Sequence, residues 1–164
     1  MSRLRPGEVL AGLGAVALLV VLFADWFQLE TGTTGDGGPS TMGWTSLGWP
    51  VAGLLAVTAV LALWLCVATV ARGVAEAVAA GVATTALATF AALVLLVRIL
   101  AQPDLGVGAP NDLVAVRFAA WVGLLSTVLI AAGAFIALRD ERLEAPESAY
   151  EPPEPRPAPR PGES

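Results

Sequence analysis

The sequence has no lysine, no histidine and a single cysteine, and these absences exclude several kinds of site. Without histidine, the chain lacks the commonest general base and the commonest metal ligand. A lone cysteine, Cys66, can form neither an intramolecular disulfide nor a zinc site built on cysteines. Among its features there is no recognisable catalytic constellation, so we expect no enzyme, no cofactor and no metal.

Nucleic acid is not an expected partner either. All nine basic residues are arginine, and they form no basic patch interleaved with aromatic side chains. The formal net charge of −5 comes from acids that crowd into the last 25 residues. That charge therefore describes the end of the chain and not a binding face.

Long apolar stretches dominate what remains. Hydrophobic residues make up 56% of the 164 residues and the mean hydropathy is +0.73. No charge occurs from Ala77 to Val97 or from Phe118 to Leu138, two runs of 21 residues each. At 1.5 Å per residue, such a helix crosses the ~30 Å hydrocarbon core of a bilayer. We therefore predict an integral protein of the cell (plasma) membrane.

The predicted fold is all-α, a bundle of four transmembrane helices with short loops. We place the helices at residues 9–29, 48–71, 74–100 and 112–138, within a membrane domain of residues 1–142. Pro50 is tolerated in a first helical turn, and Arg72 followed by Gly73 is a typical helix end. Seven of the twelve prolines lie in residues 143–164, so we expect that tail to be disordered and cytoplasmic.

The arginines near the helix ends predict the orientation. Five lie on one side of the membrane and two, Arg98 and Arg117, on the other, which places both termini in the cytoplasm. Three tryptophans then gather at the outer boundary, as in an interfacial aromatic belt. These residues are Trp26, Trp44 and Trp49.

Small residues recur at every fourth position of the last two helices and favour close helix packing in lipid. We expect packing within the chain, with a homo-oligomer face as the alternative. The two rows are Gly73, Ala77, Gly81, Thr85 and Thr89, and Ala115, Ala119, Gly123, Thr127 and Ala131.

Two charged residues, Asp25 and Arg98, lie close to the ends of predicted spans, and the orientation of the helices does not account for them. If the first helix continues to residue 29, Asp25 lies five turns beyond Gly7, on the same helix face. Arg98 comes close to the outer level as well, so we predict an intramembrane ion pair between them. The alternative for each side chain is to extend toward the headgroups, which is our expectation for Arg117.

Several short motifs together resemble a family of uncharacterised actinobacterial four-helix membrane proteins. The motifs are Asp25-Trp26, Gly43-Trp44, Arg98 with Pro103, and Gly133 followed by Ala137-Leu138-Arg139-Asp140-Glu141-Arg142. The likeness covers residues 5 to 142. It implies the same architecture, and it brings no activity, cofactor or site residue.

Function is the least constrained property. We expect a non-enzymatic accessory or scaffold component that contacts the lipid bilayer and a membrane-protein partner or a second copy of itself. The alternative is a small transporter, channel or sensor that uses the intramembrane charges Asp25 and Arg98. A membrane enzyme with a site made of carboxylates and arginine is a more distant alternative.

Overall fold

In a computed structural model, the chain is mostly helical. The structure describes residues 5–29, 40–71, 74–101 and 114–148. The elements, in chain order, are α1 (Pro6–Val21), β1 (Asp25–Leu29), β2 (Ser40–Met42), α2 (Gly43–Ser46), α3 (Gly48–Ala71), α4 (Val74–Leu100), β3 (Val114–Val116) and α5 (Phe118–Ser148).

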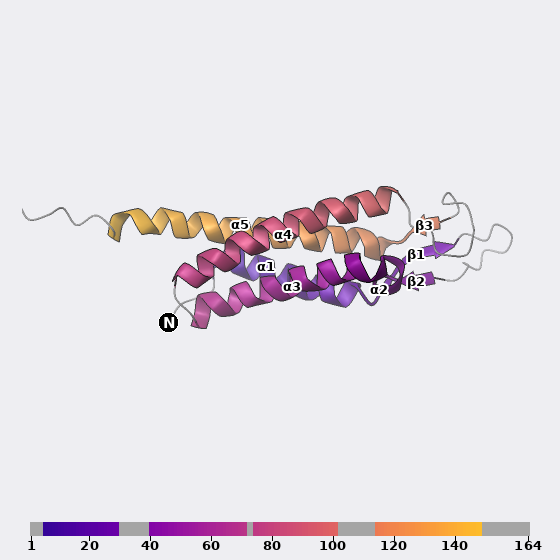
Figure 1. The fold of residues 1–164 in the computed structure, drawn as a ribbon, viewed down its shortest axis with the longest axis horizontal. Helices are drawn as coiled ribbons and strands as arrows, with labels where there is room; N and C mark the ends of the chain where they lie inside the picture. The colour runs from indigo at the N-terminus through magenta and orange to yellow at the C-terminus, as the bar shows by residue number, and fades with distance from the viewer. Residues whose placement is uncertain (1–4, 30–39, 72–73, 102–113, 149–164) are drawn as a thin grey trace, which may run out of the picture.

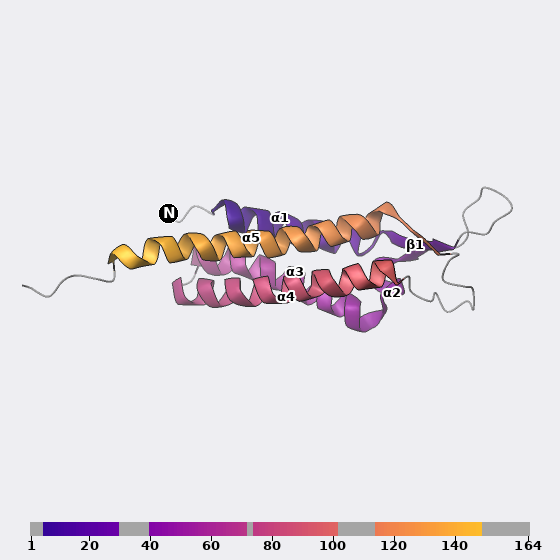
Figure 2. The same ribbon diagram turned by 90° about the horizontal axis from the view of Figure 1, so that it is seen from above.

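The helices α1, α3, α4 and α5 lie side by side in an elongated bundle (Figures 1 and 2). α1 packs against α3 and α5, and α4 packs against the same two helices. Three stretches are long and apolar enough to cross a membrane: Gly48–Val70, Glu76–Leu100 and Phe118–Asp140. α1 is also apolar but has only 16 residues, or ~24 Å of helix. It is therefore shorter than a ~30 Å hydrocarbon core.

The closest approach in the bundle is between α1 and α5, which run antiparallel. A Cβ added to Gly7 would lie 2.6 Å from the backbone nitrogen of Ala137 and 2.7 Å from the carbonyl oxygen of Gly133. A Cβ on Gly133 would in turn lie 2.5 Å from the nitrogen of Ala11. The two backbones are thus in direct contact, which only glycine permits at these positions. Small residues make this contact possible, as is common for helices in lipid.

The predicted first helix is wrong at its end. Residues 25–29 are a β-strand, and α1 stops at Val21. The reason is Trp26, whose side chain is fully buried in the core cluster. Its ring lies between two glycines: a Cβ on Gly43 would lie 2.6 Å from Cε2 of the indole, and one on Gly123 would be closer still. A continuing helix could not place the indole there.

The break also satisfies backbone groups that a helix end leaves unpaired. The indole Nε1–H of Trp26 donates to the carbonyl of Val21 at 2.6 Å. The N–H groups of Gly43 and Trp44, in the first turn of α2, donate to the carbonyls of Ala24 and Leu22 at 3.0 Å each. The end of α1 and the start of α2 therefore pair their unused donors and acceptors.

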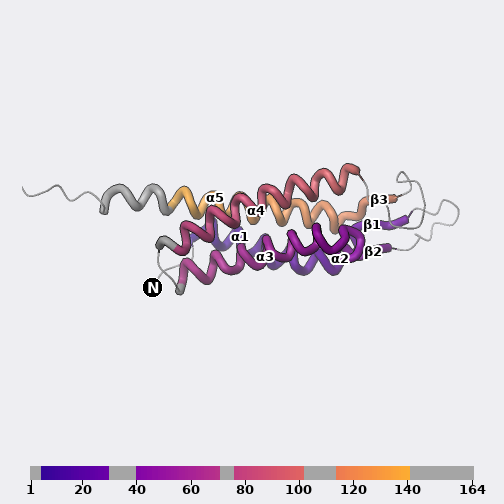
Figure 3. The backbone as a smooth tube through the Cα atoms, in the orientation of Figure 1, coloured from indigo at the N-terminus to yellow at the C-terminus, as the bar shows by residue number. Residues whose placement is uncertain are grey.

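A three-stranded antiparallel sheet of order β2-β1-β3 closes one end of the bundle, where α4 ends and α5 begins (Figure 3). Phe27 is paired with Thr41 on one side and with Val116 on the other, and the β1–β2 register is irregular between Asp25 and Phe27. The prediction of an all-α fold missed this sheet, because its strands are only three to five residues long.

The bounds predicted for the other three helices agree better with the structure than those of the first helix. α3 and α4 have the bounds expected from the sequence. α5 begins at Phe118 and not at 112, because residues 114–116 pair with β1. It continues to Ser148, so residues 143–148, expected to belong to the disordered tail, are helical. The remaining tail, residues 149–164, lies outside the described residues.

We predict that Trp26→Ala lowers the free energy of unfolding in detergent by about 3–5 kcal/mol, because it empties a fully buried site. Trp49, which is 84% exposed, provides the matched control. Reversible chemical unfolding of both variants measures the difference. Equal losses for Trp26→Ala and Trp49→Ala would contradict this account of where α1 ends.

Candidate functional site

At the sheet end, Arg117 and Ser40 form a small polar cluster around Asp25, the first residue of β1. Oδ2 of Asp25 accepts a hydrogen bond from the Ser40 hydroxyl at 2.8 Å. Nη1 of Arg117 lies 3.9 Å from the same oxygen. The side chain of Arg117 is 46% exposed and that of Asp25 is 40% exposed. The cluster joins β1, β2 and the residue that precedes α5. Such an exposed ion pair contributes about 0.2–1 kcal/mol to stability.

Asp25 therefore has a different partner from the one expected. We predicted Arg98, and the ion pair in the structure is with Arg117. The difference follows from the end of α1, which places Asp25 in a strand and not on the inward face of a helix. Arg117 was expected to extend toward headgroups. Its backbone N–H donates to the carbonyl of Trp26 at 2.8 Å, which holds the residue beside Asp25, and its side chain is 46% exposed.

Arg98 lies in the last turn of α4 and is half-buried. Its Nε is buried, and among the described residues it has no hydrogen-bond partner. Arg98 and Asp25 thus lie at the same end of the bundle without forming the expected pair. A transport or sensing site built on their interaction has no support in this geometry.

The three tryptophans expected in an interfacial belt lie in different surroundings. Trp26 is fully buried and belongs to the core instead. Trp44 is 43% exposed and stacks on Phe23, with ring centroids 6.5 Å apart and planes 4° from parallel. Trp49 projects from the first turn of α3 and is 84% exposed. Trp44 and Trp49 therefore retain the exposure that a belt requires.

Glu8 is a buried acid that the sequence reasoning missed. It is 1% exposed in the first turn of α1, and its Oε2 accepts a hydrogen bond from the backbone N–H of Arg5 at 3.0 Å. The thiol of Cys66 donates to the carbonyl of Glu8 at 3.3 Å, which links α3 to α1. Pro6 followed by an acid in the third helical position is a typical helix start. The first helix was predicted to begin at residue 9, so Pro6 and Glu8 were not recognised as its first turn.

The buried hydroxyls of the helices are all satisfied within the protein. Most donate to the carbonyl four residues earlier: Thr58 to Leu54, Ser126 to Val122 and Thr127 to Gly123, at 2.7–2.8 Å. The hydroxyl of Thr84 instead reaches from α4 to the carbonyl of Leu61 on α3, at 3.4 Å. These groups therefore need no ligand, and they are typical of polar side chains in helix packing.

Two hollows open on the outer surface of α4. One is a groove of about 530 Å³ toward α5, and the other a cavity of about 380 Å³ toward α3. The groove is almost entirely apolar, whereas the cavity includes a carboxylate. The groove is lined by Val82, Thr85, Ala86, Thr89, Phe90, Leu93 and Leu138. The cavity is lined by Leu61, Trp64, Glu76, Ala79 and Ala80.

Within the described part of the chain, no three side chains of His, Cys, Asp or Glu come together to hold a metal ion. Comparison with known proteins adds no assignment. The chain matches no family model, no curated protein and no solved structure among those compared.

We predict an energetic coupling between Asp25 and Arg117. The variants Asp25→Asn, Arg117→Gln and the double variant should give a coupling of about 0.2–1 kcal/mol, because each single change removes the same exposed ion pair. Unfolding in detergent measures it. Asp25→Asn with Arg98→Gln is the control and should be additive. Coupling to Arg98 in place of Arg117 would contradict the structure.

Proposed function

We propose that the chain is a four-span integral membrane protein with both termini in the cytoplasm and the sheet end outside. One observation carries this proposal: large apolar side chains cover the outward faces of the long helices. In water, such continuous apolar surfaces would promote aggregation, whereas lipid solvates them. Examples are Val57, Val60 and Val67 on α3, Phe90, Leu93 and Val97 on α4, and Leu125, Val128 and Phe135 on α5.

The short helix α1 supports a span of its own when β1 is included. Trp26 and Phe27 are both fully buried and continue the apolar packing beyond Val21. Asp25, Ser40 and Arg117 then lie at the membrane surface, where exposed charges cost little. Phe23, Trp44 and Trp49 surround the same end and fit an interfacial belt.

Within the membrane, we propose a non-enzymatic accessory or scaffold role, in line with the resemblance to uncharacterised four-helix membrane proteins. The buried hydroxyls bond to the protein's own backbone, and the helices are packed through small residues. This interior favours a rigid packing module over a conduit. The groove between α4 and α5 is the surface we assign to a membrane partner, because its outer side chains leave an apolar hollow that a second helix can fill.

We predict a defined labelling pattern for the topology. In a Cys66→Ala background, Gly37→Cys should react with a membrane-impermeant maleimide in intact cells, whereas Ser148→Cys should react only after the membrane is permeabilised. Gel-shift analysis of the labelled protein measures both. The five-to-two distribution of arginines is the reason for this orientation. The reverse pattern would exclude the orientation, and labelling of both positions in intact cells would exclude an odd number of spans between residues 37 and 148, and with it the three spans α3, α4 and α5.

We also predict that a partner can be captured through the groove. A photoreactive benzoylphenylalanine replacing Phe90, which is 56% exposed in the groove, should cross-link to one reproducible protein in cells. The same replacement at Val57, which is 52% exposed on α3 outside the groove, is the matched control. Mass spectrometry identifies the product. Identical products from both positions would mean that the groove has no specific partner, and a product containing only this chain would indicate a homo-oligomer.

A further inference from the structure

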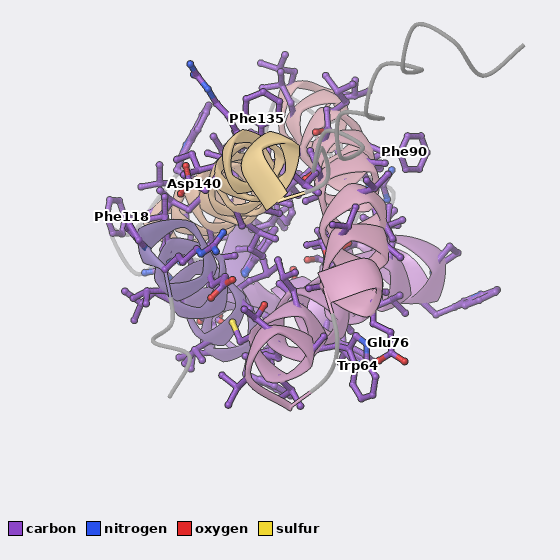
Figure 4. All side chains as sticks on the ribbon, turned by 90° about the vertical axis from the view of Figure 1, so that its left-hand side faces the viewer. Trp64, Glu76, Phe90, Phe118, Phe135 and Asp140 are labelled. Atoms are coloured by element: carbon purple, nitrogen blue, oxygen red, sulfur yellow. The ribbon has the colours of Figure 1, made fainter. Side chains whose placement is uncertain are left out.

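The cavity between α3 and α4 combines three chemical properties. Trp64 of α3 and Glu76 of α4 form its walls, and Leu61, Ala79 and Ala80 form the rest of its lining. Viewed from the end of the bundle opposite the sheet, the indole of Trp64 and the carboxylate of Glu76 lie beside one another on the outside of the two helices (Figure 4). The cavity therefore combines a carboxylate, an indole and apolar side chains.

These properties select a particular kind of ligand. The carboxylate attracts a cation, and the face of an indole is the aromatic surface that binds cations best. A strongly hydrated inorganic cation would lose water in the cavity, and the three apolar side chains have no polar atoms to replace that water. They do offer contacts to alkyl groups. An ammonium group that carries an apolar chain can contact all five lining residues.

The position of the cavity favours the same ligand. Glu76 is the first residue of the apolar stretch Glu76–Leu100, and Trp64 lies about two turns before the end of Gly48–Val70. In the membrane embedding proposed above, on which this inference rests, the cavity opens at the cytoplasmic surface of the bilayer. An amine there can bind between Trp64 and Glu76 while its chain extends into the hydrocarbon along α4.

We propose that this cavity binds the ammonium group of an amphiphilic amine. Two sources share this chemistry: the headgroup of an aminophospholipid in the cytoplasmic leaflet, and a free amine with an alkyl chain. Trp64 and Glu76 also interact with other groups of the protein. The ligand must compete with those contacts, so binding of moderate affinity is expected.

The test uses the tryptophans as reporters. The full chain is labelled with 5-fluorotryptophan in maltoside micelles, and the Trp64 resonance is assigned from its loss in Trp64→Phe. On titration with octyltrimethylammonium, the Trp64 fluorine signal should shift saturably. Trp49, which is 84% exposed at the other end of the bundle, reports nonspecific partition into the micelle. Glu76→Gln should weaken the saturable binding about tenfold, which corresponds to about 1.4 kcal/mol.

Two controls make the result specific. Asp140→Asn removes a carboxylate at the same end of the bundle but on another face, and it should titrate like the wild type (Figure 4). Octylsulfonate, an anion with the same chain, should give no saturable shift at Trp64. The proposal is overturned if the wild-type signal does not saturate, or if Glu76→Gln binds the cation as tightly as the wild type. Glu76→Gln and Asp140→Asn should both retain the wild-type melting temperature.

Nanodiscs distinguish the two sources. Octyltrimethylammonium should bind in discs made of phosphatidylglycerol alone. Weaker apparent binding after phosphatidylethanolamine is added assigns the cavity to a lipid headgroup, and unchanged binding assigns it to a free amine. The micelle titration does not depend on orientation or span number. A failure of this inference is therefore distinguishable from a failure of the topology, which the cysteine labelling tests separately.

Discussion

The insertion of Trp26 between Gly43 and Gly123 is the contact on which the rest of the architecture depends. It requires two positions without a Cβ, one at the start of α2 and one in α5, and it draws the chain away from a helical path after Val21. The indole N–H then bonds the carbonyl of Val21, so the same side chain fills the core and satisfies a backbone group. Because Trp26 belongs to β1, its position also determines where β2 and β3 can pair.

The distribution of charge follows from that break. Had α1 continued to residue 29, Asp25 would project from a helix inside the bundle. In the structure it begins a strand at the sheet end, where Ser40 and Arg117 contact its carboxylate. The sequence predicts that Asp25 lies within the membrane, whereas in the structure its carboxylate is partly exposed and paired. Arg98, at the same end, contributes to no such pair among the described residues.

The interior and the exterior of the bundle have complementary chemistry. Inside, small residues allow backbones to touch, and the buried hydroxyls of Thr58, Ser126 and Thr127 bond to their own helices. Outside, valine, leucine and phenylalanine face away from the core. The Trp64–Glu76 cavity departs from this pattern because it places a carboxylate and an indole on an otherwise apolar surface.

Local chemistry by itself determined α3 and α4, because no charge interrupts residues 48–71 or 77–97, and Arg72 followed by Gly73 is a local helix-end signal that separates the two runs. The row of small residues in α4 was less reliable. Residues four positions apart are rotated by about 40° around the helix axis, so a row with this spacing gradually leaves one helix face. Ala77 and Gly81 are therefore buried, whereas Thr89 faces outward. Only the tertiary structure decided where α1 ends, which arginine pairs with Asp25, and which surfaces Trp26 and Trp64 occupy. Each of these depends on residues distant in sequence that meet only after the helices pack.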